Sequence, residues 1–208
     1  AANASLNAMA DDVVALLDQL ALPSVALCGH SLGGKVAMLT ALAHAERVSR
    51  LCVVDIAPVE YAMAGNRAIL EAMAALPASA LCSRKLADAA LLSAATDDNA
   101  LKQPFVRQFL LQNLQPEEQA WRLNVSALLD GYSGMRGFPA HEGSSADMPT
   151  LFIGGECGGM LERSHWQHCM SFFPQAELTM MPTGHWIHAE KPIEFTELVD
   201  RFCADVAC

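Results

Sequence analysis

Basic residues are scarce in this sequence of 208 residues. Thirteen Lys and Arg stand against 23 Asp and Glu, which gives a formal net charge of −10. Proteins that bind nucleic acids use clustered Lys and Arg to neutralise phosphates, and the sequence has no such cluster. We therefore expect no nucleic-acid partner, and solubility is the simplest use of the negative charge.

Long hydrophobic runs and a regular cysteine pattern are also lacking. No run approaches the roughly 18 apolar residues that a membrane span needs, and no signal-peptide pattern opens the sequence. The seven cysteines are an odd number without the spacing of a disulfide framework, and several lie within apolar runs. We expect reduced thiols, no membrane span and a cytoplasmic location, or a mitochondrial one in a eukaryote.

The residues that are present suit one folded domain. Hydrophobic residues make up 52% and charged residues 17%, which is a globular composition rather than a disordered one. A chain of this length can bury a sizeable core. No internal repeat or low-complexity segment is found, so the organisation must be inferred from the order of helices and strands.

One stretch, residues 24–38, organises the rest of the chain. An apolar run predicts a buried strand, and the Ala, Leu and Met residues after Gly34 predict a buried helix. Between them lies the pattern G-x-S-x-G, from Gly29 to Gly33. In that pattern a serine occupies a sharp strand-to-helix turn that exposes its hydroxyl. Ser31 is therefore the candidate nucleophile.

The same residues also fit most of a phosphate-binding P-loop. Gly29-x-x-x-x-Gly34-Lys35 has the required spacing, and the next apolar strand ends in Asp55, a candidate magnesium ligand. The Ser or Thr that should follow the lysine is missing, because that position is Val36. The missing metal ligand and the presence of the serine favour a hydrolase over a nucleotide-binding protein.

The remaining elements predict a mostly parallel sheet flanked by helices. One predicted strand leads to Ser31, and the other three cover residues 51–56, 149–154 and 176–181. The predicted helices around them cover residues 6–20, 34–45, 162–173 and 194–206, and Asn3 or Ser5 could cap the first. The first strand–helix–strand unit should be right-handed, which makes its two strands parallel neighbours.

The region from residue 60 to residue 146 has a different pattern. It contains no convincing strand, and its predicted helical stretches are 63–75, 84–95, 103–114 and 116–129. A helical block that begins beside Asp55, at the ligand-binding end of the sheet, suggests a cap over a site. We therefore predict a core of residues 1–59 and 147–208 and a helical cap of residues 60–146.

A serine nucleophile needs a base, and the base needs an acid to orient it. His185 is the candidate base, because it follows a glycine in the loop after the last predicted strand and histidine comes last in chain order in such folds. His188 could form a metal-binding pair with it, but no Cys or carboxylate stands at ligand spacing, so we expect no metal. Two carboxylates compete as the acid, and Asp55, which ends a predicted strand, is favoured over Glu156.

Four motifs carry a resemblance to a known family. They lie at residues 29–35, 54–61, 108–111 with 121–124, and 184–192. In these motifs the sequence resembles the YbfF-type esterases and the abhydrolase-domain-containing protein 11 group. The resemblance implies an α/β-hydrolase fold with a helical cap, carboxylesterase activity on short acyl esters or thioesters without a cofactor, and Asp55 as the acid.

The sequence also departs from that family. Its members carry further residues before the first predicted helix, including the first strands of the sheet and a His-Gly loop that supplies one oxyanion donor. These N-terminal strands are absent from the sequence as it stands. The other donor is the N–H of the residue after the nucleophile, here Leu32. His30 and Trp186 are the candidate substrate contacts.

Three hypotheses about function follow. The first is a serine carboxylesterase acting on a small-molecule acyl ester through Ser31, His185 and Asp55. The second is a catalytically weak or inactive chain with half an oxyanion hole, which would associate with itself through an exposed sheet edge. The third is a carbon–carbon hydrolase or lyase, since one fold hosts many reactions.

Overall fold

The computed structural model describes residues 4–62, 64–96, 100–139 and 144–204. The chain forms two compact units. The larger comprises Ser5–Glu60 and Gly137–Cys208, and the smaller comprises Ala1–Ala4 and Tyr61–Arg136. Residues 137–139 and 144–146, which the sequence predicted to belong to the cap, thus lie in the larger unit.

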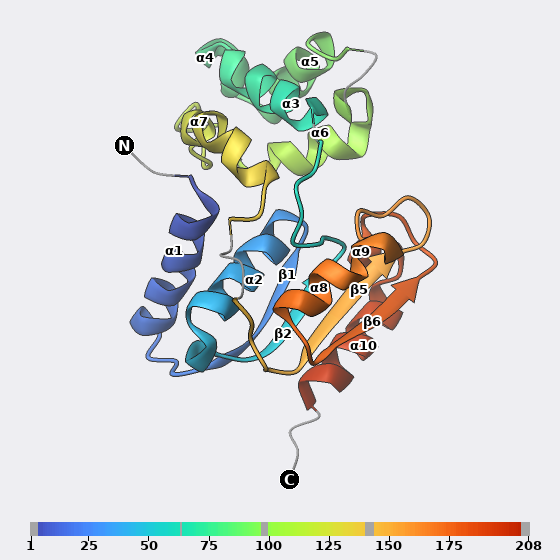
Figure 1. The fold of residues 1–208 in the computed structure, drawn as a ribbon. Helices are drawn as coiled ribbons and strands as arrows, with labels where there is room; N and C mark the ends of the chain where they lie inside the picture. Colours follow the sequence, from blue (N-terminus) through green and yellow to red (C-terminus); the bar gives the residue numbers. More distant parts are fainter. Residues whose placement is uncertain (1–3, 63, 97–99, 140–143, 205–208) are drawn as a thin grey trace. The chain divides into compact units, whose positions relative to one another are not determined.

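The larger unit is built on a parallel sheet, confirming the predicted α/β architecture (Figure 1). Its strands, in spatial order, are β1 (Val25–His30), β2 (Val48–Val54), β5 (Thr150–Gly155) and β6 (Ala176–Met181). All adjacent pairs run parallel, so the first two strands are the neighbours that the right-handed crossover predicted. The carboxyl ends of all four strands therefore lie at one edge of the sheet.

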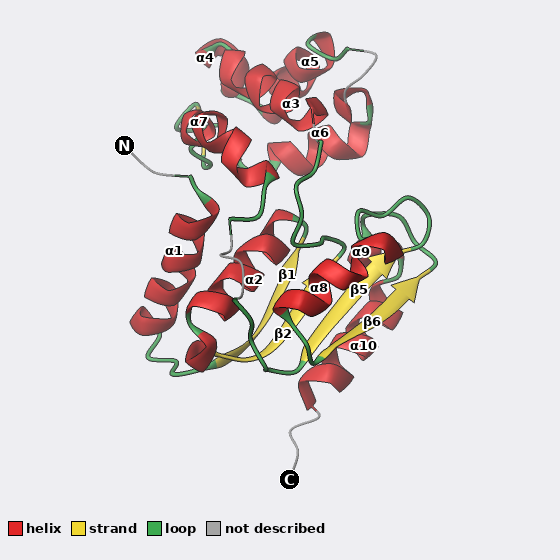
Figure 2. Ribbon diagram, viewed as in Figure 1, coloured by secondary structure: helices red, strands yellow, loops and turns green. Residues whose placement is uncertain are grey.

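Helices cover both faces of this sheet (Figure 2). The helices of the larger unit are α1 (Leu6–Gln19), α2 (Leu32–Ala43), α8 (Trp166–Phe172), α9 (Ile187–Glu190) and α10 (Pro192–Ala204), with short 3-10 turns at Ala45–Arg47 and Arg163–His165. Ser5 caps α1, because its hydroxyl accepts the N–H of Ala8 at 3.2 Å. The alternative cap Asn3 and the predicted helix ends Met63 and Val206 lie outside the described residues.

The core of the larger unit joins the sheet to α10. Buried residues of β2, β5, β6 and α9 pack against Phe195, Leu198, Val199 and Phe202, which recur at helical spacing on one face of α10. The strand β1 is different, because Ala26 and Cys28 are exposed. None of the described helices has the length and apolar character needed to cross a membrane.

The smaller unit is mostly helical, with one departure from the prediction. Its helices are α3 (Ala64–Ala75), α4 (Ala78–Leu81), α5 (Arg84–Ser93), α6 (Pro104–Leu111) and α7 (Val125–Arg136), with a 3-10 turn at Ala100–Lys102. The predicted helix 116–129 is wrong over its first half, where residues 116–119 form a turn and β4 (Ala120–Trp121) follows. The strand β4 pairs antiparallel with β3 (Leu114–Gln115), which lies just before the turn. Pro116 interrupts the helical pattern here, and Gln119 turns the chain with φ 50°.

A buried cluster holds the smaller unit together. It includes Met73, Leu91, Leu101 and Leu111, and the Nε1–H of Trp121 donates to the carbonyl of Met73 at 3.0 Å.

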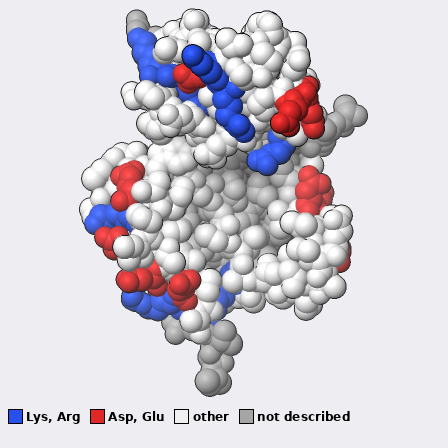
Figure 3. Space-filling model, turned by 180° about the vertical axis from the view of Figure 1, so that it is seen from behind, with Lys and Arg blue, Asp and Glu red and all other residues white. Residues whose placement is uncertain are grey.

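The space-filling view in Figure 3 shows acidic and basic side chains interspersed on one face of the molecule, with wide uncharged areas between them.

Candidate active site

The strand-to-helix turn at Ser31 has the sharp geometry that its glycines predicted. Ser31 has φ 54° and ψ −123°, a strained conformation for a residue with a Cβ, and α2 starts at the next residue. A Cβ on Gly29 would lie 2.2 Å from the carbonyl oxygen of Gly33, and one on Gly34 would lie 2.5 Å from Ile56. Only glycine fits at these two positions, so Gly29 and Gly34 allow the close backbone approach at this turn, whereas a Cβ on Gly33 would meet no atom within 4 Å.

The acid candidate Asp55 follows β2 and is fully buried, with 0% exposure. Its carboxylate accepts backbone N–H groups from Gly155 at 3.0 Å, Met160 at 2.8 Å and Leu161 at 3.2 Å. A Cβ on Gly159 would lie 2.5 Å from Asp55 Oδ1, so that glycine allows the loop to wrap around the carboxylate. Sequence reasoning missed these donors, because they are backbone N–H groups, which every non-proline residue possesses.

His185 connects the acid to the serine. Its Nδ1 lies 2.7 Å from Asp55 Oδ2, and its Nε2 lies 3.1 Å from Ser31 Oγ. The structure therefore brings together the three side chains singled out in the sequence. Glu156, the competing acid, is exposed in the loop after β5.

The loop that carries His185 is itself fixed. The N–H of Gly184 donates to Glu190 Oε2 at 2.9 Å, a contact that sequence reasoning missed. A Cβ on Gly155 would lie 2.3 Å from the carbonyl oxygen of Gly184, so the loops after β5 and β6 touch through their backbones. Close backbone packing of this kind holds the imidazole in place from both sides.

Two opposing effects act on the pKa of Asp55. Burial alone raises it, because a charged carboxylate is poorly solvated in the interior. The hydrogen bonds from His185 and from the N–H groups of Gly155, Met160 and Leu161 together outweigh burial and lower the pKa below its ordinary value. Asp55 is thus held as a carboxylate, the form that accepts a proton-bearing imidazole nitrogen.

The two candidate substrate contacts lie beside His185. The His30 ring centroid is 4.6 Å from that of His185 and 4.8 Å from that of His188. Its Nε2 lies 2.9 Å from the backbone carbonyl oxygen of His185, so the Nε2–H tautomer donates to it. Burial, the largest effect, lowers the pKa of His30 and favours the neutral ring. The Trp186 ring lies 5.7 Å from that of His30.

The lysine of the P-loop alternative has a different environment from a phosphate ligand. Lys35 is 2% exposed, and its Nζ donates to the carbonyls of Val59 at 2.9 Å and Gly137 at 2.7 Å. Burial lowers its pKa to about 8. The ammonium group therefore stabilises two backbone segments of the larger unit, and the nucleotide-binding hypothesis is not supported by its geometry.

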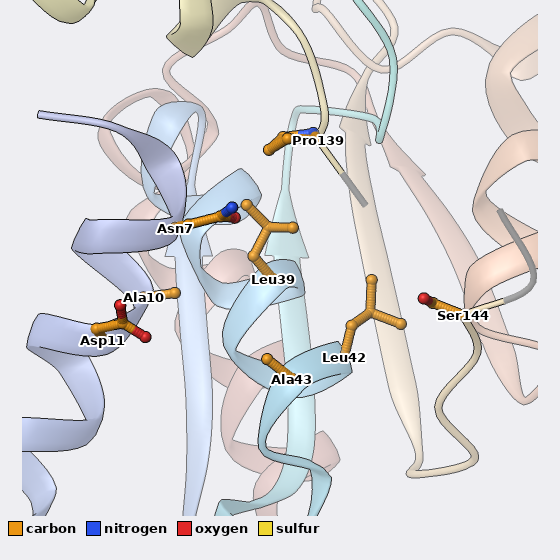
Figure 4. A pocket seen from close by; sticks show the side chains of 8 residues that line it. All are labelled: Asn7, Ala10, Asp11, Leu39, Leu42, Ala43, Pro139 and Ser144. Atoms are coloured by element: carbon orange, nitrogen blue, oxygen red, sulfur yellow. The ribbon is translucent and has the colours of Figure 1, made fainter. Parts of the chain in front are cut away.

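A separate cavity of about 340 Å³ opens beside α1 and α2 (Figure 4). Its lining residues are Asn7, Ala10, Asp11, Leu39, Leu42, Ala43, Pro139 and Ser144. None of Ser31, Asp55 and His185 lines it. The described residues contain no group of three His, Cys, Asp or Glu side chains arranged to hold a metal ion.

Comparison with known proteins decides the family. The model of the alpha/beta hydrolase fold family matches residues 3–192. The chain belongs to the α/β-hydrolase family. Among curated α/β-hydrolases, an sn-1-specific diacylglycerol lipase of Mus musculus is 39% identical over 97% of the chain and 66% of its own length. Esterase YbfF of Escherichia coli K12 is 34% identical over 95% of the chain and 74% of its own length.

Solved structures agree with this α/β-hydrolase assignment. A marine microorganism esterase superposes with a TM-score of 0.84 and 28% identity, covering 96% of this chain and 78% of that one. A meta-cleavage product hydrolase from Pseudomonas fluorescens shares the fold at a TM-score of 0.61 and 20% identity, covering 97% and 72%. The chain spans about two thirds of the length of the lipase that it matches.

Proposed function

We propose that this α/β-hydrolase is a serine carboxylesterase that acts on short acyl esters or thioesters. The observation that carries the proposal is the continuous path of hydrogen bonds from Ser31 through His185 to Asp55, with contacts of 3.1 and 2.7 Å. A serine hydroxyl is a weak nucleophile and becomes effective only when a neighbouring base removes its proton. The named activities of the lipase and esterase relatives support an ester as the substrate.

The proposed reaction has two halves. In the first, Ser31 Oγ attacks the ester carbonyl while His185 Nε2 takes the hydroxyl proton, and the protonated ring then gives that proton to the leaving alkoxide. In the second, His185 activates a water that hydrolyses the acyl-enzyme. Asp55 keeps Nδ1 protonated and stabilises the imidazolium in both halves, which its lowered pKa allows across the neutral range.

The remaining site residues have supporting roles in this proposal. The N–H of Leu32 lies in the first turn of α2, where backbone N–H groups have no acceptor within the helix, and it would bind the oxyanion. His30 positions the base through the His185 carbonyl. Trp186, half-buried beside the two imidazoles, is the proposed contact for the substrate. The reaction needs no cofactor.

One observation favours a second property of the chain. The strand β1 is at an edge of the sheet and exposes Ala26 and Cys28, and unpaired strand edges pair readily with other chains. We expect self-association through this edge. Solution mass by light scattering tests it, and a monomer at high concentration contradicts it.

The decisive experiment combines turnover with active-site labelling. Ser31→Ala should reduce p-nitrophenyl acetate hydrolysis on the order of 10⁴- to 10⁶-fold and abolish labelling by a fluorophosphonate probe. Ser24→Ala, which changes an exposed serine just before β1, is the matched control and should leave both unchanged. Equal labelling of the wild-type and Ser31→Ala chains would refute the proposal. A panel of carbon–carbon bond substrates separates the esterase from the alternative chemistry.

A further inference from the structure

Two cysteines face each other across the first two strands of the sheet. The strands β1 and β2 run side by side (Figure 1). Cys28 of β1 is the register partner of Cys52 of β2, so both side chains project from the same face of the sheet. Neighbouring strands lie about 4.7–4.9 Å apart. That spacing falls within the roughly 4.4–6.8 Å between Cα atoms that a disulfide can join. A disulfide also holds its two Cβ atoms about 3.5–4.5 Å apart, so linking this pair draws the two strands slightly together.

The two thiols differ in access and in chemistry. Cys28 is exposed, whereas Cys52 is buried with 2% exposure. The hydrogen bond from the Cys52 thiol outweighs burial and lowers the pKa of Cys28. The same contact, and then burial, raise the pKa of Cys52. An exposed thiol with a lowered pKa, next to a second thiol that can displace a bound group, is the usual arrangement of a redox-sensitive pair.

We propose that Cys28 and Cys52 form a reversible disulfide in exchange with low-molecular-weight disulfides. The Cys28 thiolate attacks one sulfur of the small disulfide, whose S–S bond breaks and releases one thiolate. The Cys52 sulfur then attacks the Cys28 sulfur, loses its proton to solvent and releases the second thiolate. Two protein thiols are thereby oxidised, and the small disulfide is reduced to two thiols.

The position of the pair connects it to the proposed active site. Cys28 precedes Ser31 by three residues, and Cys52 precedes Asp55 by three residues. A disulfide would pull the two strands together directly below the turns that carry these side chains. Small displacements of reacting groups are costly, so hydrolysis should fall by about ten- to a hundredfold on oxidation. This consequence for activity rests on the proposed function, whereas the disulfide itself does not.

The test follows intact mass and ester hydrolysis in the same samples. The chain is equilibrated in buffers of oxidised and reduced glutathione, quenched with an alkylating reagent, and analysed by intact mass and by peptide mapping under non-reducing conditions. We expect a species that has lost two hydrogens, a linked pair of peptides containing Cys28 and Cys52, and full reversal by dithiothreitol. In Cys52→Ser we expect a stable glutathione adduct on Cys28, because the displacing thiol is gone.

Two matched variants assign the linkage. Cys82→Ser removes an exposed thiol of the smaller unit and should leave the disulfide unchanged. Cys203→Ser removes the half-buried thiol of α10 that lies near Cys52, and the disulfide should again persist. Absence of the linked peptides, or a link between Cys52 and Cys203, would overturn the proposal.

The activity arm has separate outcomes. A disulfide that forms without loss of hydrolysis would overturn the connection to Ser31. A reduced chain that hydrolyses no ester would count against the proposed esterase, and the mass result would still decide whether the disulfide exists.

Discussion

The strands β1 and β2 are neighbours in register, yet they present their site residues in different ways. Each is followed by a non-glycine residue with positive φ, Ser31 at 54° and Asp55 at 51°. The strand β2 is buried over most of its length, and three backbone N–H groups hold Asp55. The strand β1 is half-exposed, and Ser31 Oγ contacts His185. The acid is thus fixed by the interior, while the nucleophile remains accessible.

Among the changes that separate the two strands, the largest effect should come from removing the charge of Asp55, the buried carboxylate that follows β2. Asp55→Asn keeps the shape of the side chain but no longer favours the His185 tautomer that accepts the serine proton, so kcat should fall by about 10⁴-fold. Glu156→Gln, at the exposed carboxylate of the next loop, is the control and should leave kcat within twofold of the wild type, about 0.4 kcal/mol. Steady-state kinetics on p-nitrophenyl acetate measure both, and a large loss only in Glu156→Gln would reverse the assignment.

The next effect concerns the loop around the acid. Gly159→Ala would place a Cβ 2.5 Å from Asp55 Oδ1 and 2.6 Å from the Gly155 carbonyl oxygen. The loop must shift to relieve that overlap, and this should lower the free energy of unfolding by about 1–3 kcal/mol. Urea denaturation measures the change. In the control Gly134→Ala the new methyl group meets no atom within 4 Å in α7, and stability should rise by about 0.4–1 kcal/mol.

A smaller effect is expected at the accessible strand. His30→Phe keeps an aromatic ring but cannot donate to the His185 carbonyl. The activation free energy should therefore rise by about 1 kcal/mol, and kcat should fall roughly fivefold. His30→Gln retains an N–H donor and should recover most of that loss. A role in substrate binding instead predicts a raised KM with unchanged kcat in both variants, so the split between the two constants decides the role.

The last effect is confined to alkaline solution. The pKa of Lys35 falls from its ordinary 10.5 to about 8 on folding. Between these values the unfolded chain binds more protons than the folded chain, so this group makes the folded state relatively more stable as pH rises. Below pH 8 both states are protonated and the contribution is constant. The unfolding free energy of the wild type, minus that of Lys35→Met, should therefore rise from pH 8 towards pH 10.5. A difference that stays constant over this range would contradict the lowered pKa.

The sequence was most informative where the chemistry depends on a local pattern. The G-x-S-x-G pattern identified the turn at Ser31, and a preceding glycine, a loop after the last predicted strand and chain order together singled out His185. The sequence favoured Asp55 over Glu156 because Asp55 ends a predicted strand, but their positions relative to His185 are a matter of spatial arrangement, which the sequence alone does not give.

Other features left little trace in the sequence. The donors to Asp55 and the contact from Gly184 to Glu190 involve backbone N–H groups, which every non-proline residue possesses, so residue identity does not reveal them. The strands β3 and β4 contain two residues each, too few to show an alternating pattern. The sequence therefore showed only the helical pattern and predicted a helix over 116–129.

The double contact of Lys35 has a consequence for how such chains can change. Its single nitrogen holds both the segment that leaves for the smaller unit, at Val59, and the segment that returns from it, at Gly137. Within the smaller unit, the N–H of Tyr61 donates to the carbonyl of Arg136 at 3.1 Å. The segment of residues 61–136 is therefore attached at two closely spaced ends. We expect that a segment of another length could replace it without altering the sheet.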